Sequence, residues 1–473
     1  MQSLPARRWW RPAARLRTAG RLVASSMYAI FGRPTELFLV LLSAGVLALA
    51  IYALELSDQA MPANYWYIPP IYLGLFLVIH FYLNVAQPES EELIVPLVAM
   101  LVAFGLTMNL RLAPELAWDQ VRWVLLGGLL MLVTMVILRD YTILQRYKYL
   151  AAGIAVILLA VTAFTPLGQT INGARLWLRV GPIQFQTTEI LKVLLIVFMA
   201  GYLAEKGQIL ERARFNWRSV KRPSLPYLVP MGLIGGLVFL MLLLAKDLGA
   251  VLILVSLAVA MLYVRTGRIG FIGGAAVLMV FNLVLVYFLP IDQFDYARLR
   301  IDSWVSPLED VEGEGYQIKQ ALLAFGHGGI TGTGLGEGYP DYIPIVETDF
   351  VFAAVGEELG LLGAMALIMI YVVLAFRGLE LSAEQTSPFL QLLGVGATTI
   401  LAAQAAVIMA GNLALFPVTG ITLPFVSYGG SSIVVNFILV AMLLRLSAST
   451  SLAASGGPGG RARQDGDSAQ RRR

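Results

Sequence analysis

Charged residues inside or beside long apolar segments are the first candidates for chemistry in this sequence. Glu189 and Lys192 lie three residues apart in one apolar run, so a helix places them on one face, where they can form an ion pair. Lys246 and Asp247 lie between two further apolar runs with no room for a loop. Helical neighbours diverge by about 100°, so we expect each of these two to find a different partner. Because an ionised group is costly in a bilayer, such residues indicate a polar cavity or a structural ion pair.

Other polar residues accompany the later apolar runs. Gln404 and Asn412 are of the type that forms hydrogen bonds between membrane helices. Residues 417–432 read PVTGITLPFVSYGGSS, and their prolines and glycines predict a broken backbone, which membranes tolerate where protein or a water-filled cavity satisfies it. Three carboxylates stand at the start of an apolar run: Asp349, Glu357 and Glu358.

The connection 291–347 is too long to be a simple linker. It contains ten acidic and three basic residues together with Trp304 and Tyr316, which favours a functional loop folded onto the membrane surface. Seven of the thirteen residues in 326–338 are glycine. No Lys-Ser/Thr follows them, so a nucleotide loop is disfavoured, and we expect His327 to be a surface histidine.

The composition excludes a soluble domain. The 473 residues are 58% apolar and 14% charged, with a mean hydropathy of +0.75, against about 45–50% and 25% in soluble proteins. The absence of cysteine excludes disulfides, thiolate metal sites and a cysteine nucleophile, and two histidines leave little room for a histidine-ligated metal.

Twelve apolar runs are long enough to span a bilayer as helices, and they lack the alternation of a membrane β-barrel. The predicted spans are 35–54, 68–86, 92–110, 120–138, 148–165, 187–204, 226–244, 248–264, 269–290, 348–374, 388–411 and 428–446.

An even number of spans places both termini on one side, and basic residues identify that side. Of the 34 Lys and Arg residues, 25 lie with the termini, eight lie opposite and Lys192 lies within a span, so we expect cytoplasmic termini. The basic arm 1–34 then orients the chain and attracts anionic lipids, and no nucleic-acid partner is implied. It precedes an uncleaved anchor rather than forming a signal peptide. Residues 447–473 are predicted to be a disordered cytoplasmic tail.

Four blocks in order resemble the SEDS family of RodA, FtsW and SpoVE. They are NGARLWLRVGPIQFQTTEILK (172–192), KDLGA (246–250), PLEDVEGEGYQIKQALLAFGHGGITGTGLGEG (307–338) running on to ETDFVFAAVGEELGLLG (347–363), and PVTGITLPFVSYGGSS (417–432). The resemblance implies an all-α polytopic membrane protein with a ten-helix core at 91–446, preceded here by two additional spans at 35–90. Departures from the family pattern occur at Ala245, Lys246, Ala250, Val311 and Thr187-Thr188.

The family polymerises lipid II into peptidoglycan strands at the outer face of the bacterial cytoplasmic membrane, together with a class B penicillin-binding protein. Displacing an α-linked pyrophosphate to give a β-1,4 bond inverts the anomeric carbon, so one in-line attack suffices. A carboxylate can take the proton of the attacking hydroxyl, and arginine, lysine or a divalent cation can stabilise the leaving pyrophosphate. Elongation and division members share these motifs, so the pathway stays open.

The resemblance assigns roles to residues. Asp310 matches the aspartate on which the family's activity depends, as general base or as ligand of a divalent cation, Mg2+ or Mn2+; Glu309 and Glu312 are adjacent alternatives, and no organic cofactor is implied. Arg175 and Arg300 match arginines that could bind pyrophosphate. Lys192 and Glu189 would shape the cavity or contact substrate. Lys246 departs from the family pattern and adds a cation of unknown purpose. The remaining candidates match motif positions for which structural support is an equal reading: Asp247, Gln317, Thr348, Asp349, Ser427, Ser431 and Ser432.

Two alternatives to a glycosyltransferase remain open. Twelve spans, intramembrane charges and broken helices also suit a flippase or transporter of lipid-linked precursors. The second alternative is a scaffold protein with a decayed catalytic site, and the retained Asp310 argues against it.

Overall fold

The computed structural model describes residues 32–57, 59–138, 140–171, 174–181, 183–212, 225–288, 295–307 and 314–456. Within these ranges, each predicted span corresponds to a helix. The twelve long helices are α2 (Pro34–Leu56), α3 (Ile68–Ala86), α4 (Ile94–Leu112), α5 (Ala117–Ile137), α7 (Lys148–Phe164), α8 (Thr187–Arg212), α9 (Leu225–Leu244), α10 (Leu248–Thr266), α11 (Gly270–Phe288), α16 (Gly360–Ala383), α17 (Pro388–Asn412) and α18 (Gly430–Gly456).

Length and composition show which helices can cross a bilayer. Among the described residues, nine helices are long and apolar enough, while Lys148–Phe164 and Val229–Leu244 are shorter apolar stretches. The chain is therefore an all-α polytopic membrane protein, as predicted.

The start of the tenth span was predicted wrongly. Residues from 348 onward first form two short helices, α14 (Val346–Asp349) and α15 (Val351–Glu358), and the long helix α16 begins only at Gly360. Gly360 has a φ of +66°, a left-handed conformation that suits glycine and turns the chain between α15 and α16. Asp349, Glu357 and Glu358 therefore precede the span instead of occupying it.

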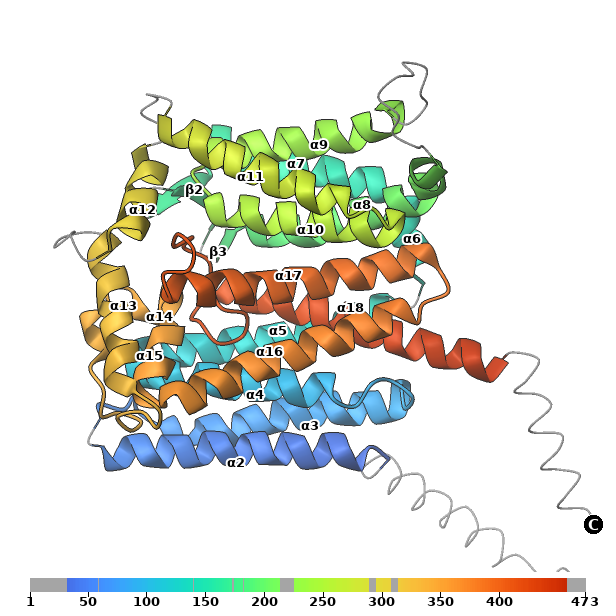
Figure 1. The fold of residues 1–473 in the computed structure, drawn as a ribbon. Helices are drawn as coiled ribbons and strands as arrows, with labels where there is room; N and C mark the ends of the chain where they lie inside the picture. Colours follow the sequence, from blue (N-terminus) through green and yellow to red (C-terminus); the bar gives the residue numbers. More distant parts are fainter. Residues whose placement is uncertain are drawn as a thin grey trace, which may run out of the picture.

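The long helices lie side by side, with different structures at the two ends of the bundle. Figure 1 shows α12 (Asp295–Val305), α13 (Glu314–Gly328), α14, α15 and the strands at one end, and α6 (Thr142–Arg146) at the other. We call the first of these the loop end. Helix α2 begins and α18 ends at the α6 end (Figure 1). Residues 447–456, predicted as tail, continue α18, and residues 457–473 lie outside the described ranges, as does the arm before residue 32.

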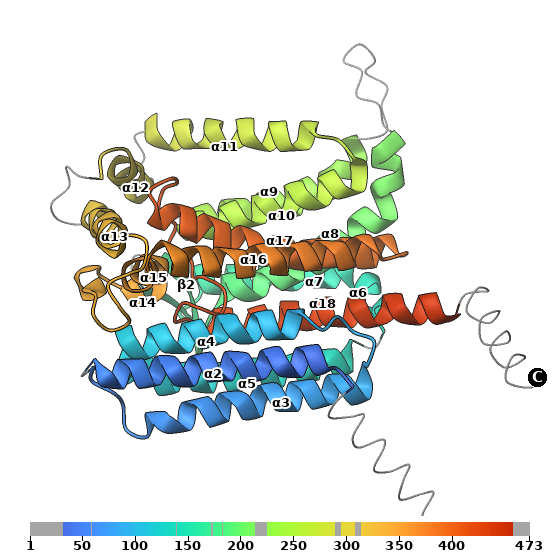
Figure 2. The same ribbon diagram turned by 60° about the horizontal axis from the view of Figure 1, so that its bottom comes forward.

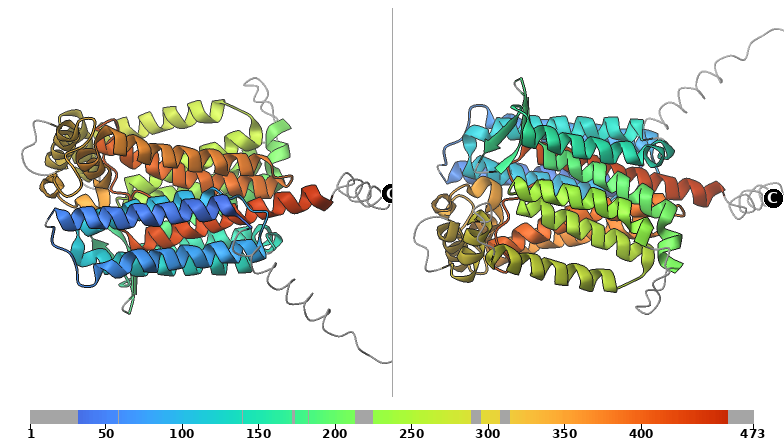
Figure 3. Two further views of the ribbon diagram at one scale, coloured as in Figure 1. Left: turned by 90° about the horizontal axis from the view of Figure 1, so that it is seen from below. Right: turned by 90° about the horizontal axis from the view of Figure 1, so that it is seen from above.

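The core helices lie between two edges. The additional pair α2 and α3 forms one edge and α9 and α11 the other (Figure 2), and Figure 3 shows these two faces in turn. Between them, α4, α8, α17 and α18 bury most of their side chains, whereas α2, α10 and α16 bury a third or less. Small residues allow the backbones in this core to approach closely. For example, a Cβ at Gly105 of α4 would collide with the carbonyl oxygen of Phe425.

A small antiparallel sheet lies at the loop end, where the sequence analysis predicted no strands. Its order is β1 (Gly168–Ile171), β2 (Ala174–Val180) and β3 (Ile183–Gln186), and β3 leads directly into α8. In the β2–β3 register, Trp177 pairs with Gln186 and Arg179 with Gln184. The sheet therefore connects α7 to α8 across the loop end.

Candidate functional site

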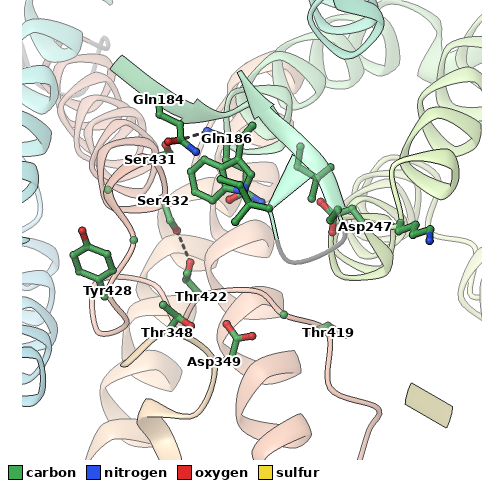
Figure 4. A pocket seen from close by; sticks show the side chains of 18 of the residues that line it. Gln184, Gln186, Asp247, Thr348, Asp349, Thr419, Thr422, Tyr428, Ser431 and Ser432 are labelled. Carbon is green, nitrogen blue, oxygen red and sulfur yellow. Dashed lines mark hydrogen bonds between the residues drawn. The ribbon is translucent and has the colours of Figure 1, made fainter. Parts of the chain in front are cut away.

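A cavity of about 430 Å³ lies at the loop end, walled by the sheet, α12, α14 and the irregular segment 413–429. Figure 4 shows polar side chains from these elements gathered around it. Its lining residues are Trp123, Ile171, Ala174, Leu176, Trp177, Gln184, Gln186, Lys246, Asp247, Arg300, Thr348, Asp349, Thr419, Gly420, Thr422, Tyr428, Gly429, Gly430, Ser431 and Ser432. The segment 413–429 confirms the predicted broken backbone, since it joins α17 to α18 without regular structure.

The predicted ion pair of Glu189 and Lys192 is present and buried. The Nζ of Lys192 lies 2.8 Å from Oε1 of Glu189 and 2.8 Å from Oε1 of Gln404. The amide Nε2 of Gln404 in turn donates 2.8 Å to the carbonyl of Thr422, a lining residue. Neither Glu189 nor Lys192 lines the cavity, so both hold its wall from behind. Gln404 makes the interhelical hydrogen bonds expected of it.

Two serines of the fourth motif line the cavity and brace its wall. Ser432 Oγ accepts a 2.8 Å hydrogen bond from Thr422 Oγ1, and Ser431 Oγ accepts a 3.1 Å bond from the backbone N–H of Gln186 (Figure 4). The first bond joins the irregular segment to α18, and the second joins the sheet to α18. Ser427 is buried, accepts from the N–H of Leu423 and donates to the carbonyl of Thr348. Ser427 therefore supports the segment rather than facing the cavity.

Arg300 and Asp349 approach one another at a single glycine. A Cβ at Gly420 would lie 3.3 Å from Nη2 of Arg300 and 3.7 Å from Oδ2 of Asp349. Gly420 has a φ of +67°, so both conformation and space favour glycine there. Arg300 also donates 2.9 Å to the carbonyl of Val418. The cavity thus holds a guanidinium beside a carboxylate, positioned by α12 and the irregular segment.

Asp247 and Lys246 occupy the connection between α9 and α10. Both residues line the cavity; Asp247 Oδ1 accepts from the N–H of Ala250 at 2.8 Å and caps α10, while Lys246 has a φ of +63°. The expectation that each finds a different partner stays a prediction. Asp247 Oδ2 is buried with no hydrogen-bond partner among the described residues. Burial raises the pKa of Asp247, and the nearby charges of Lys192 and Arg300 act against that rise.

Two further predicted site residues, Arg175 and Gln317, do not line this cavity. The guanidinium of Arg175 donates from Nε to the carbonyl of Thr162 at 3.1 Å and from Nη2 to that of Thr165 at 2.7 Å, which caps the end of α7. Gln317 lies on α13, apart from the lining residues. Asp310, with Glu309 and Glu312, lies outside the described residues, between α12 and α13. Its assigned role therefore stays a prediction.

Several lining residues were not predicted from the sequence. Trp177, Gln184 and Gln186 come from the unexpected sheet, Trp123 comes from α5 and Tyr428 from the irregular segment. The alternation of polar and apolar residues in ARLWLRV (174–180) was the available signal for a strand. Burial raises the pKa of the Tyr428 phenol, and the nearby carboxylate of Asp119 adds to that rise.

Adjacent carboxylates fasten the glycine-rich stretch next to this cavity. Glu358 Oε1 accepts from Nε of Arg111 at 2.7 Å, and its Oε2 accepts from the N–H of Gly336 at 3.0 Å. Glu357 Oε1 accepts from the N–H of Tyr339 at 3.1 Å and lies 3.0 Å from Nδ1 of His327. His327 is exposed, as predicted for a surface histidine. These bonds attach the glycine-rich stretch to α15 and to Arg111 of α4.

The arrangement can bind an anionic, hydroxyl-bearing ligand. Arg300 and Lys246 supply positive charge, Asp247 and Asp349 supply carboxylates, and glutamines and hydroxyls supply hydrogen bonds. Within the described ranges, no group of three or more His, Asp or Glu side chains could hold a metal ion.

Comparisons with known proteins match this chain over most of its length. The family described as "Cell cycle protein", that of FtsW, RodA and SpoVE, matches residues 92–452. The peptidoglycan glycosyltransferase RodA of Mycobacterium tuberculosis (strain ATCC 25618 / H37Rv) is 34% identical over 432 residues, covering 88% of this chain and 90% of that protein. The probable peptidoglycan glycosyltransferase FtsW of Geobacter sulfurreducens (strain ATCC 51573 / DSM 12127 / PCA) is 34% identical, covering 77% and 97%.

Solved structures show the same fold. A chain from "Structural coordination of polymerization and crosslinking by a peptidoglycan synthase complex" aligns with a TM-score of 0.63 at 26% identity, covering 76% of this chain and 98% of that one. RodA of Thermus thermophilus aligns with a TM-score of 0.52 at 26% identity, covering 76% and 96%. The family match, the relatives and the shared fold agree: this chain belongs to the FtsW, RodA and SpoVE family of membrane proteins.

Proposed function

We propose that this protein is a peptidoglycan glycosyltransferase that polymerises lipid II into β-1,4 glycan strands at the outer face of the bacterial cytoplasmic membrane. The single observation that carries the proposal is the loop-end cavity, which combines Arg300 and Lys246 with carboxylates and hydroxyls. The relatives named peptidoglycan glycosyltransferases support the reaction. The excess of basic residues on the side of the termini supports cytoplasmic termini, and therefore an outward-facing cavity.

The reaction needs one displacement. The 4-hydroxyl of the acceptor sugar attacks the anomeric carbon of the donor, the new C–O bond forms on the opposite face, and the bond to pyrophosphate breaks. The hydroxyl proton passes to a base, for which Asp310 is the candidate. Arg300 stabilises the charge that develops on the leaving pyrophosphate. Because the anomeric carbon inverts once, no covalent enzyme intermediate is required.

The alternative role of Asp310 is to bind a divalent cation, Mg2+ or Mn2+. Mg2+ in proteins is commonly held by one or two carboxylates together with substrate phosphates, so Asp310 and the pyrophosphate of lipid II would be a sufficient set of ligands. When bound, the cation would neutralise pyrophosphate charge. An Asp310→Cys variant separates the two roles: rescue by Mn2+ but not Mg2+ indicates a cation ligand, whereas a base is not rescued by either.

The partner that we propose is a class B penicillin-binding protein, which crosslinks the strands that this chain makes. The support is the similarity to a chain from a solved complex that couples polymerization to crosslinking.

The test is purified protein in liposomes with lipid II, a divalent cation and the crosslinking partner. We expect glycan polymer on a gel, and its loss when the cation is removed with EDTA. Movement of labelled lipid II between leaflets without any polymer would overturn the proposal in favour of a flippase or transporter.

A further inference from the structure

We infer that a second saccharide-binding site, specific for the N-acetylated sugar units of a glycan strand, lies between α13 and the turn Tyr339–Ile343. The choice of ligand depends on the proposed function, because the strand would be made in the neighbouring cavity. The geometry of the site stands independently of that function.

Exposed aromatic rings define the site. A cavity of about 190 Å³ separates α13 from the turn, and Tyr339 and Tyr342 are 62% and 64% exposed at its rim. The Tyr339 ring is stacked on His327, with 6.4 Å between centroids and 21° between planes, and lies 6.1 Å from the Tyr342 ring. Adjacent exposed flat rings offer apolar faces against which the C–H faces of sugar rings can stack.

Fixed polar groups accompany the rings. Glu357 is 3% exposed, and its Oε1 is oriented by the N–H of Tyr339 and by His327. Gln320 adds an amide that can both donate and accept. Side chains held in place before binding lose little entropy when they bind hydroxyl and acetamido groups. The charge of Glu357 favours a neutral sugar over a pyrophosphate.

Apolar residues complete the lining. Leu323 and Ala324 of α13 face the cavity together with Ile343 of the turn, and this wall can receive the methyl group of an acetamido substituent. Aromatic faces, a few fixed polar groups and a small apolar wall form the usual composition of a small-ligand site.

The site and the catalytic cavity are separated by one short segment. Ile343 lines the first and Thr348, five residues later, lines the second. Between them, Ile345 has a φ of +58°, which is costly for a β-branched residue, and α14 begins immediately after it. This strained turn lies within the short segment that connects the two linings, so a strand that leaves one cavity can be held at the other.

A protein partner is the competing occupant. A stable protein interface buries about 800 Å² on each partner around an apolar centre. The small hollow, with its buried carboxylate and rim of phenols, fits a sugar unit better.

The test measures binding of the neutral tetrasaccharide of N-acetylglucosamine by saturation-transfer NMR and titration calorimetry, with the full-length protein in nanodiscs. We expect Tyr339→Ala and Tyr342→Ala each to weaken binding about tenfold, and Tyr339→Phe to retain it because the ring remains. Tyr67→Ala is the matched control: Tyr67 is also 62% exposed, follows α2 at the loop end and should leave binding unchanged.

The same variants should shorten the strands made from lipid II at an unchanged initial rate. Equal tetrasaccharide binding by wild type and both alanine variants, at equal thermal stability, would overturn the inference. So would loss of co-purification with the crosslinking partner while saccharide binding is unchanged, because the surface would then belong to a protein contact. Absence of polymer from wild type would overturn the proposed function instead, whatever the binding result.

Discussion

The ammonium group of Lys192 lies 2.8 Å from Oε1 of Gln404, which joins α8 to α17 behind the loop-end cavity. The same ammonium group pairs with Glu189, and the amide of Gln404 continues to the carbonyl of Thr422 on the cavity wall. A buried cation is thereby connected to the lining through one side chain. This relationship makes the pair a positioning device for the segment 413–429.

Removing one charge of the buried pair should destabilise the protein strongly. Lys192→Met leaves Glu189, which is 5% exposed, without its countercharge, and breaking a buried pair costs about 3–5 kcal/mol. We expect a large fall in the thermal unfolding midpoint in detergent. The double variant Glu189→Gln/Lys192→Met should recover most of it, and a single variant as stable as wild type would contradict the assignment.

Two arginines that the sequence treats alike should behave differently. Arg300→Gln should lower polymerisation about 100- to 1000-fold with little change in stability, because it removes a donor from the cavity. Arg175→Gln should lower stability by about 1–3 kcal/mol with most activity kept, because it removes hydrogen bonds to the end of α7. Initial rates and unfolding midpoints of both variants test this, and the reverse pattern would refute it.

Asp247 should make stability depend on pH. Its pKa is raised above the ordinary value of 3.8 by burial, so the folded state favours the protonated carboxyl. The protonated carboxyl stabilises the folded state fully at a pH below the ordinary pKa of 3.8, and this stabilisation is lost as the pH rises through the raised pKa of the folded state. Asp247→Asn keeps an oxygen to cap Ala250, so its unfolding midpoint should exceed that of wild type at pH 7 and vary less with pH. Unfolding midpoints of wild type and Asp247→Asn that change with pH to the same extent would contradict this.

The Glu358–Arg111 pair should hold the glycine-rich stretch in place. Glu358→Gln weakens the bond to Arg111, so amide hydrogen exchange in residues 329–342 should become faster. Glu337→Gln, at an exposed position of the same stretch, is the matched control and should leave exchange unchanged. Equal exchange in all three proteins would show that backbone packing alone holds the stretch.

Much of the fold follows from hydrophobic length alone. Each apolar run longer than a bilayer core became a helix, and the ion pair Glu189–Lys192 followed from spacing on one helix. The tenth span failed because the apolar character of α15 hides the left-handed turn at Gly360. An apolar segment is expected to be buried, but not necessarily to span the membrane. Helix α15 is buried against its neighbours in the loop end without being part of the long helix.

The sequence motifs contained several of the residues that line the cavity, but the sheet that forms part of its wall was not predicted. Arg300, Asp247 and Ser432, which the resemblance offered as candidates, line one cavity. The sheet was missed because its strands are short and their pairing depends on contacts between segments, which a single sequence does not display. Arg175 shows that a motif does not fix a side chain's contacts. The resemblance assigned it to pyrophosphate binding, whereas its guanidinium donates to carbonyls at the end of α7. The Glu36–His80 bond, which fastens α2 to α3, depends on tertiary contact in the same way.

The most direct measurement of the central claim compares two aspartates of the connection 291–347. Purified Asp310→Asn and Asp302→Asn proteins, matched in folding and supplied with lipid II, a divalent cation and the partner, are assayed for glycan polymer over time. Asp302 is exposed on α12 and serves as the control. We predict a loss of at least about a hundredfold for Asp310→Asn and wild-type rates for Asp302→Asn. Wild-type polymerisation by Asp310→Asn would contradict the proposed glycosyltransferase mechanism.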